Sequence, residues 1–247
     1  MAYLTQSQYK LDKSQAKGWK TVGLNLSPDV EAKLVLGNKK LPTMCAMAGT
    51  CASVCLVKTG MNKFPKHARV RALKTKEWIQ APKVFVANVS KEIAQAEQAA
   101  KRAGMKLAVR PNLLSDQPAL AHMLAKAHPH VQFYDYTKLP RPRGRMLDNY
   151  HLTYSVSERT TREDLVHCLA YGINLAVVTN VRRGKPFPKT MRVMGKCLRI
   201  VDGDADDLRF LDDEGVVVGL RWKGSNADLA VGLAGNFVHD VTKELVR

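Results

Sequence analysis

The sequence of 247 residues contains no apolar run that approaches the roughly 18 residues of a membrane-spanning helix, so we expect no membrane partner. Its first twenty residues are polar from the start and lack the apolar core of a secretory signal, which predicts a cytoplasmic protein. Internal repeats and low-complexity segments are absent. With only 16 glycines and 11 prolines, the composition excludes a disordered, collagen-like or fibrous chain.

Acidic residues are scarce beside basic ones, 22 against 39, which gives a net charge of +17. Residues 1–110 carry a net charge of +14, residues 111–197 carry +7 and residues 198–247 carry −4. A field of this sign attracts polyanions, of which nucleic acid is the commonest in a cell. The charge therefore predicts contact with DNA or RNA, and a soluble protein that happens to be basic is the alternative. No helix-turn-helix, zinc-finger or aromatic-rich RNA-binding signature accompanies the charge.

Apolar runs that predict strands alternate with helical patterns after a basic, flexible arm over residues 1–20. The expected strands cover residues 21–28, 106–110, 131–136, 149–155, 173–179, 197–201 and 216–222, and the expected helices cover residues 65–80, 82–103, 117–127, 161–172 and 204–211. The helix over 82–103 is predicted from an apolar stripe at spacings of three and four: Phe85, Val89, Ile93, Ala96 and Ala100. The alternation predicts a single α/β domain over residues 21–247 with parallel strands.

Polar residues follow nearly every expected strand at its C-terminal end. In a β/α barrel these ends form the mouth of the active site. We therefore expect a complete or partial (β/α) barrel. The alternative is an open doubly wound sheet, in which polar groups gather mainly at the point where the strand order reverses.

Three of the five cysteines, Cys45, Cys51 and Cys55, lie within eleven positions of a cysteine-rich loop over residues 43–60. Clustered cysteines in a cytoplasmic chain indicate a metal site rather than disulfides. Three thiolates could hold a 4Fe-4S cluster and leave one iron open to a substrate or cofactor. Zinc is the alternative metal, and a structural zinc site would need a fourth ligand such as His67. Three buried thiols that only pack are the remaining alternative.

The placement of these cysteines directly after the first strand resembles that in radical S-adenosylmethionine enzymes, and so does the order of strands and helices. The chain also resembles an uncharacterised phage-encoded family in two motifs, Asn25 to Pro28 and Arg110 to Asp116. The spacing here is five and three residues between cysteines, whereas three and two are usual in the superfamily. The resemblance implies Cys45, Cys51 and Cys55 as cluster ligands, and it implies S-adenosylmethionine as a candidate cofactor.

The strand ends supply the other candidate residues. Arg110 could hold a carboxylate or phosphate group, and the same strand end adds further cofactor-binding candidates: Asn112, Ser115 and Asp116. The catalytic candidates are Arg110, Asp116, Asp135 and Asp202. Two basic loops that follow strands are expected to contact nucleic-acid phosphates through Lys138, Arg141, Arg143, Arg145, Arg182 and Arg183.

These observations favour an iron–sulfur protein, phage-encoded and active in the host cytoplasm, that binds or modifies a nucleotide or nucleic acid. Radical chemistry with S-adenosylmethionine would need an electron donor as a partner. The first alternative is a non-catalytic nucleic-acid-binding protein whose iron–sulfur or zinc site only holds a loop. The second is a metal-dependent nuclease that uses acidic strand ends, Asp135 with Asp202 and Asp204, to bind Mg²⁺.

Overall fold

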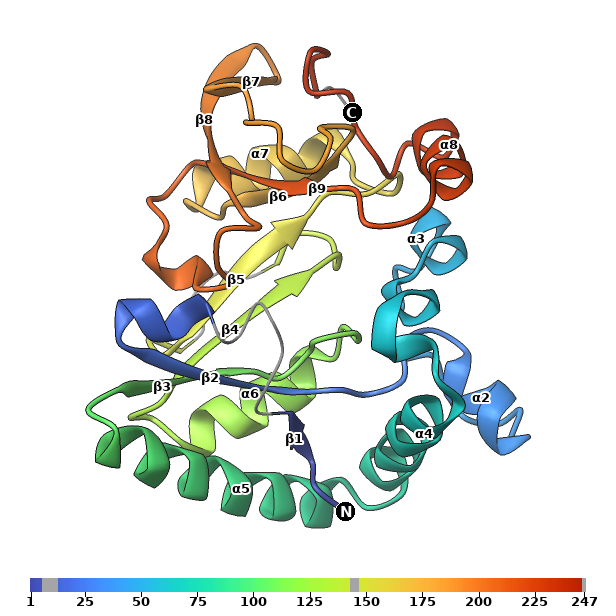
Figure 1. The fold of residues 1–247 in the computed structure, drawn as a ribbon, viewed down its shortest axis with the longest axis vertical. Helices are drawn as coiled ribbons and strands as arrows, with labels where there is room; N and C mark the ends of the chain where they lie inside the picture. The colour runs from blue at the N-terminus through green and yellow to red at the C-terminus, as the bar shows by residue number, and fades with distance from the viewer. Residues whose placement is uncertain (6–12, 143–146, 246–247) are drawn as a thin grey trace. The chain divides into compact units, whose positions relative to one another are not determined.

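The computed structural model describes residues 1–5, 13–142 and 147–245, and the chain divides into two compact units (Figure 1). Unit 1 comprises Met1–Ala46, Gly60–Asp135 and Arg145–His151. Unit 2 comprises Met47–Thr59, Tyr136–Gly144 and Leu152–Arg247. Each unit therefore combines segments that are distant in the sequence.

A sheet of nine strands, mostly parallel, runs through the fold in the order β1-β2-β3-β4-β5-β6-β9-β8-β7. Its strands are β1 (Leu4–Thr5), β2 (Trp19–Leu24), β3 (Lys106–Arg110), β4 (Gln132–Thr137), β5 (Tyr150–Ser155), β6 (Leu175–Thr179), β7 (Thr190–Val193), β8 (Lys196–Asp202) and β9 (Val217–Arg221). The pairs β2–β3, β3–β4, β5–β6, β6–β9 and β8–β9 are parallel, whereas β1–β2 and β7–β8 are antiparallel. The prediction of an α/β fold with parallel strands is thus confirmed at this level.

The expected complete barrel is not formed, because the sheet is open and ends at β1 and β7. Closing a barrel requires the first and last parallel strands to pair with each other. Here β1 occupies the outer edge of β2 and β7 occupies the outer edge of β8, both in antiparallel orientation. The edges that closure would need are therefore already paired, and the architecture is compatible with an open α/β sheet.

The helices of unit 1 are η1 (Lys13–Lys17), α2 (Glu31–Leu36), η3 (Gly60–Lys63), α4 (Pro65–Gln80), α5 (Pro82–Arg102) and α6 (Pro118–Ala127). The helices α4, α5 and α6 each begin at a proline, whose fixed φ suits the first helical position. The predicted stripe of α5 is fully buried and packs against β2 and β3, which confirms that helix (Figure 1).

Part of the N-terminal segment expected to form an arm belongs to the fold. Leu4 and Thr5 pair with β2, and the backbone N–H of Tyr3 donates to Glu92 Oε1 at 2.8 Å. The ring of Tyr3 also packs edge-on against Phe85, with ring centroids 5.3 Å apart. These contacts attach the start of the chain to α5.

Unit 2 contains α3 (Thr50–Ser53), η2 (Leu56–Lys58), α7 (Arg162–Ala170), η4 (Arg209–Leu211) and α8 (Asn226–Ala234). Reciprocal side-chain and backbone hydrogen bonds close the first turns of α7 and α8, through Thr161 with Asp164 and Ser225 with Asp228. The core of unit 2 is apolar and includes Tyr154, Leu165, Cys168, Val177 and Val217. Within the ranges that the structure describes, no helix is both long enough and apolar enough to cross a bilayer.

The helix expected over 204–211 is reduced to the short η4, because aspartate side chains bind the backbone in place of a helical ladder. Asp202 Oδ1 accepts from the N–H of Asp204 at 2.9 Å, and Asp206 Oδ1 accepts from that of Leu208 at 2.9 Å. The Arg209 side chain is only 2% exposed, and it forms ion pairs with Asp206 at 3.0 Å and Asp212 at 3.2 Å. The acidic run therefore encloses a buried cation instead of starting a helix.

Replacing Arg209 with Met should lower the free energy of unfolding by about 3–5 kcal/mol, because it leaves carboxylates buried without their counter-ion. Arg199→Met is the control, since Arg199 pairs with Asp213 at an exposed site and its loss should cost less than about 1 kcal/mol. Urea denaturation of both variants measures the difference. Equal effects of the two substitutions would show that the buried pairs do not stabilise unit 2.

Candidate functional site

A buried polar network lies at the carboxyl ends of β3 and β4 in unit 1, with Asp135 at its centre. Asp135 is 1% exposed. Its Oδ1 accepts a hydrogen bond from the backbone N–H of Asn112 at 3.0 Å. Its Oδ2 accepts from Asn112 Nδ2 at 2.8 Å and from the Tyr150 hydroxyl at 3.3 Å. Two residues predicted from separate strand ends, Asn112 and Asp135, are therefore in direct contact.

The side chain of Asn112 also organises the loop between β3 and α6. Its Oδ1 accepts from the Ser115 hydroxyl at 2.8 Å and from the backbone N–H of Gln117 at 2.9 Å. Because its amide nitrogen and backbone N–H both donate to Asp135, one side chain joins the carboxyl group to the whole loop. The predicted residues Asn112 and Ser115 thus belong to one network.

The same loop crosses β2 at a glycine. The backbone N–H of Leu113 donates to the carbonyl of Leu24 at 3.1 Å, and the Leu113 side chain covers Gly23. A Cβ at Gly23 would lie 2.4 Å from Leu113 Cδ1, closer than carbon atoms pack. The missing side chain at Gly23 therefore allows the loop to lie directly on the sheet.

Burial raises the pKa of Asp135 to about 7, although the positive charge of Arg110 and the hydrogen bonds from Asn112 act in the opposite direction. The charge of Asp116 raises that pKa further. Burial, with the nearby charge of Asp135, also holds the pKa of Tyr150 well above its usual range. Asp135 is therefore partly protonated near neutral pH, and to that extent it does not cancel the charge of Arg110. Four of the five predicted residues of this edge, Arg110, Asn112, Asp116 and Asp135, thus interact through this carboxyl group, and the fifth, Ser115, is joined to it through Asn112.

Cys45 lies against the same loop. Its thiol donates to the carbonyl of Leu114 at 3.6 Å. The adjacent carbonyl of Met44 accepts from the backbone N–H of Asp116 at 2.9 Å and from Gln117 Nε2 at 3.1 Å. The first predicted cluster ligand and the predicted cofactor-binding residues thus share the carboxyl edge of unit 1.

The other two cysteines of the loop, Cys51 and Cys55, belong to unit 2. The residue before Cys51, Thr50, donates its backbone N–H to Glu158 Oε1 at 2.7 Å, and its hydroxyl donates to the carbonyl of Gly235 at 3.3 Å. Gly49 leaves room for that carboxylate, since a Cβ there would lie 1.7 Å from Glu158 Oε1. The end of β5 therefore fixes the start of α3.

Cys45, Cys51 and Cys55 form no disulfide within the described part of the chain and are of intermediate exposure, whereas Cys168 is buried and Cys197 is exposed. Among the side chains in residues 1–5, 13–142 and 147–245, no three of His, Cys, Asp and Glu come together as a group that could hold a metal ion. The reduced thiols suit a soft metal centre. The cluster of three cysteine ligands stays a prediction.

Asp202, predicted as catalytic, lies in unit 2 within a network of ion pairs. Its Oδ1 lies 2.8 Å from Arg221 Nη1, while Asp204 lies 3.4 Å from the same nitrogen and 3.1 Å from Lys223 Nζ. Burial alone would raise the pKa of Asp202, but the hydrogen bond from Arg221 lowers it. The guanidinium of Arg221 also stacks on Phe187, 4.1 Å from the ring centroid. These ion pairs give Asp202 and Asp204 a structural role at this strand end, and they do not favour a magnesium site.

The residues predicted to contact nucleic acid lie on loops of unit 2, as far as the structure describes them. Lys138 Nζ lies 5.8 Å from the ring centroid of Phe237, and the backbone N–H of Arg141 donates to Asp164 at 3.0 Å. Arg182 and Arg183 are exposed. Arg143 and Arg145 lie outside the described residues.

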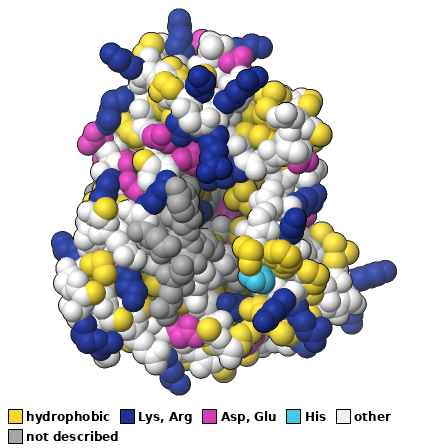
Figure 2. Space-filling view, in the orientation of Figure 1, with side chains coloured by type: hydrophobic (Ala, Val, Ile, Leu, Met, Phe, Trp, Pro, Cys, Tyr) yellow, Lys and Arg dark blue, Asp and Glu magenta, His cyan; other side chains and the backbone are white. Residues whose placement is uncertain are grey.

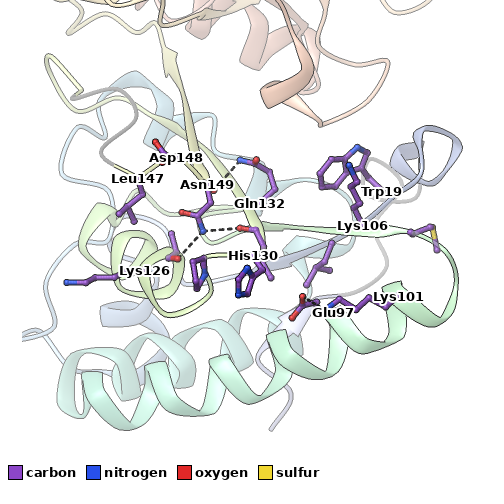
Figure 3. A pocket seen from close by; sticks show the side chains of 15 residues that line it. Trp19, Glu97, Lys101, Lys106, Lys126, His130, Gln132, Leu147, Asp148 and Asn149 are labelled. Atoms are coloured by element: carbon purple, nitrogen blue, oxygen red, sulfur yellow. Dashed lines mark hydrogen bonds and ion pairs between the residues drawn. The ribbon is translucent and has the colours of Figure 1, made fainter.

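A pocket of about 830 Å³ opens at the opposite, amino edge of the unit 1 strands, and none of the predicted site residues lines it (Figure 3). Its lining includes Trp19, Lys101, Lys106, Lys126 and Asn149. Asn149 Nδ2 donates to three carbonyls at the end of α6, each at 3.0 Å. Since α5 and α6 end here, Lys101 and Lys126 offset the negative ends of the helix dipoles. Lys101 and Lys126 thus have a structural explanation, and Lys106 Nζ lies 5.6 Å from the ring centroid of Trp19.

Two members of the carboxyl-edge network were not predicted from the sequence, Tyr150 and Gln117. Tyr150 is the second residue of the strand expected over 149–155 and the first residue of β5, and its buried hydroxyl donates to Asp135. Gln117 directly precedes the proline that opens α6. A polar residue next to a helix-initiating proline is a local signal for a loop anchor, whereas nothing local singles out Tyr150.

Replacing Asp135 with Asn should remove a pH dependence of stability. In the unfolded chain the carboxyl loses its proton near pH 3.8, whereas in the folded protein it keeps the proton until about pH 7. The folded state of the wild type therefore loses stability, by a few kcal/mol, as pH rises from about 4 to about 7. Denaturation curves at several pH values should show the wild type losing stability relative to Asp135→Asn over this range. The exposed Asp148→Asn variant should follow the wild type, and parallel curves for all three proteins would contradict the assignment.

Comparison with known proteins identifies a family. No curated protein and no solved structure matches the chain. A model of the family described as Gene product 88 matches residues 3–234. A numbered gene-product description is of the kind given to phage genes, in agreement with the expected phage-like family, while the likeness to radical S-adenosylmethionine enzymes stays a prediction. Because the match covers most of the chain, the protein belongs to the Gene product 88 family.

Proposed function

We propose that the protein binds and modifies a nucleotide or nucleic-acid substrate at the carboxyl edge of the unit 1 sheet, with a 4Fe-4S cluster on Cys45, Cys51 and Cys55. The observation that carries the proposal is the position of Cys45, whose Sγ lies 3.6 Å from the carbonyl oxygen of Leu114. As a cluster ligand this sulfur would be a thiolate, so the position would remain relevant while the donated hydrogen bond would be lost. This position brings a predicted cluster ligand to the loop of the Asp135 network. Catalytic groups and a metal centre must lie this close if they are to act on one substrate.

Each residue of this carboxyl edge would have a separate role, set by its chemistry and burial. Arg110 ends β3 and is half-buried, so its guanidinium could bind a phosphate or carboxylate in a partly desolvated position. Asn112 and Ser115 hold the loop rigid through the buried Asp135. Asp135 is too deeply buried to touch a substrate, so its role would be to position the loop and to adjust the charge near Arg110. Asp116 is partly exposed and is the candidate proton acceptor.

A cubane cluster with three cysteine ligands would supply an electron or an open iron that acts as a Lewis acid. Metal binding would itself complete this site, as it does in proteins whose ligands are assembled only when the metal binds. Glu158 would hold the start of α3 during this step, since it already binds the backbone of Thr50. An electron donor is then the expected protein partner.

S-adenosylmethionine is the candidate cofactor. Arg110 and Asp116 would hold it, and Asn112 and Ser115, which are buried and bonded within the network, would position the loop that carries Asp116. The carboxylate of the cofactor suits the guanidinium of Arg110, and its amino group suits the carboxylate of Asp116. From β1 to β6, strands that follow one another in the chain are also neighbours in the sheet. This order supports the inference that the fold is a partial barrel. In such a fold the carboxyl edge is the place for the site.

Protein purified without oxygen should be brown and contain about four irons per chain, because three thiolates suit a cubane cluster. Substituting Ser for Cys45, Cys51 or Cys55 should remove the colour and most of the iron, as iron analysis and absorption spectra would show. Cys197→Ser is the control, since its exposed thiol lies outside the cysteine-rich loop and its loss should leave the iron content unchanged. Colourless protein with one zinc per chain would overturn the cluster and favour a binding protein with a structural metal.

Adding S-adenosylmethionine to the reduced protein should alter the EPR signal of the cluster and slowly yield 5′-deoxyadenosine. Arg110→Ala should raise the cofactor concentration that gives half of the signal change by about tenfold, because it removes a charged hydrogen-bond donor but no metal ligand. Its iron content should equal that of the wild type. The exposed Arg102→Ala variant is the control and should bind the cofactor as the wild type does. A signal that ignores the cofactor in the wild type would exclude radical chemistry.

A further inference from the structure

The helix α4 separates its basic residues into two groups, of which one is used by the fold. Arg71 and Lys74 lie on the inner side and are 3% and 5% exposed. Arg71 binds Glu31 through Nε at 2.9 Å and Nη2 at 2.5 Å, and Lys74 Nζ donates to the carbonyl of Tyr3 at 2.7 Å. These two cations therefore hold α2 and the N-terminal segment on α4.

The outer side of α4 carries a continuous exposed stripe at helical spacings of three, four, three and four: Lys66, Arg69, Leu73, Lys76 and Gln80. The basic face is defined here by its three cations, Lys66, Arg69 and Lys76. Within the described part of the chain none of the three takes part in an ion pair. The one acidic residue of α4, Glu77, accepts instead from the Tyr3 hydroxyl at 2.7 Å. Figure 2 shows Lys and Arg side chains exposed over α4.

This distribution of charge is unfavourable for the helix itself. Acidic residues are absent from the first turn of α4, where Lys66 stands next to the positive end of the helix dipole. Lys66 and Arg69 are three apart, a spacing at which like charges repel by a few tenths of a kcal/mol. The last turn, where a cation would stabilise the helix, contains no basic residue. Helix stability therefore does not explain the basic face, and an external anion would.

The dimensions of the face indicate the kind of anion. The ten residue steps from Lys66 to Lys76 span about 15 Å along the helix axis, at about 1.5 Å per step. A nucleic-acid duplex carries one phosphate per about 1.7 Å of its axis, so a surface of this length meets several phosphates at once. The exposed Leu73 between the cations could lie against sugar rings. A single small anion could bridge Lys66 and Arg69 but would not also reach Lys76, which is seven residues from Arg69.

We propose that the basic face of α4 binds the phosphate backbone of a nucleic acid. The proposal rests on the proposed function, because it assigns the surface that would hold a nucleic-acid substrate of that site. It transfers the main contact from the loops of unit 2, predicted from the sequence, to a helix of unit 1. Backbone contacts of this kind carry little sequence preference.

The test compares two triple variants of the full chain that each remove three positive charges. Lys66→Gln, Arg69→Gln and Lys76→Gln remove the basic face, whereas Lys91→Gln, Arg102→Gln and Lys126→Gln remove three exposed cations elsewhere in unit 1. Fluorescence anisotropy would measure the dissociation constant of a labelled 20-base-pair DNA duplex from 50 to 200 mM salt. The same sequence as single-stranded DNA and as duplex RNA would distinguish the form of nucleic acid.

The plot of log affinity against log salt should lose about two to three units of slope in the basic-face variant and less than one in the control. Because repulsion is relieved, the basic-face variant should melt at or above the temperature of the wild type. Equal slopes in both variants, with a wild type that binds, would overturn this proposal alone. A wild type that binds no nucleic acid would also remove the substrate class of the proposed function. Binding to vesicles of anionic lipid, with none to nucleic acid, would assign the face to a membrane surface instead.

Discussion

The pair of hydrogen bonds from Asn112 to the buried carboxyl of Asp135 is the interaction on which the carboxyl edge of unit 1 depends. A buried carboxyl group is costly unless its oxygens are bonded, and Asn112 supplies two of the three donors. In return, Asp135 fixes the position of Asn112 and with it the loop that contacts Cys45. The geometry of the site is therefore set by a group too deeply buried to meet a substrate.

The basic residues of the chain perform two different tasks, and burial tells them apart. Arg209 in unit 2 and Arg71 in unit 1 are enclosed with carboxylates, so their charges are satisfied by the fold. Removing such a residue leaves an uncompensated charge in the interior. The cations on the outer face of α4 have no comparable partner within the described chain, and they add to the positive surface of unit 1. A net charge of +17 alone does not distinguish these two groups.

The spacing of apolar residues predicted most helices and strands well, because this spacing follows directly from the local geometry of each element. The helix over 65–80 has the predicted bounds, and α5 buries the predicted stripe. The helix predicted over 204–211 was wrong for most of its length. The aspartates there bind backbone N–H groups and Arg209, and the spacing of residues in the sequence does not reveal such contacts. The sequence also did not predict whether the sheet closes into a barrel, because closure depends on which strand pairs with each edge of the sheet.

The candidate site was predicted in part. The rule that strand ends gather polar groups identified Arg110, Asn112, Ser115 and Asp135, because parallel strands present their carboxyl ends at one edge. It also selected Asp202, which lies in unit 2 and forms an ion pair with Arg221 from a different strand. It missed Tyr150, whose contact with Asp135 depends on the packing of two strands. Pairings between distant segments are what a single sequence contains least directly.

The chain order of the strands has a consequence for synthesis on the ribosome. In unit 1 the strands β1, β2, β3 and β4 become neighbours in the order in which they are made, so this part of the sheet can assemble as it emerges. Tyr150, however, follows Asp135 by fifteen positions and begins β5. A nascent chain that ends before residue 150 would hold the Asp135 carboxyl without its phenol donor, in a sheet still open on that side. The carboxyl edge of unit 1 is thus completed only as the ribosome starts on the bulk of unit 2.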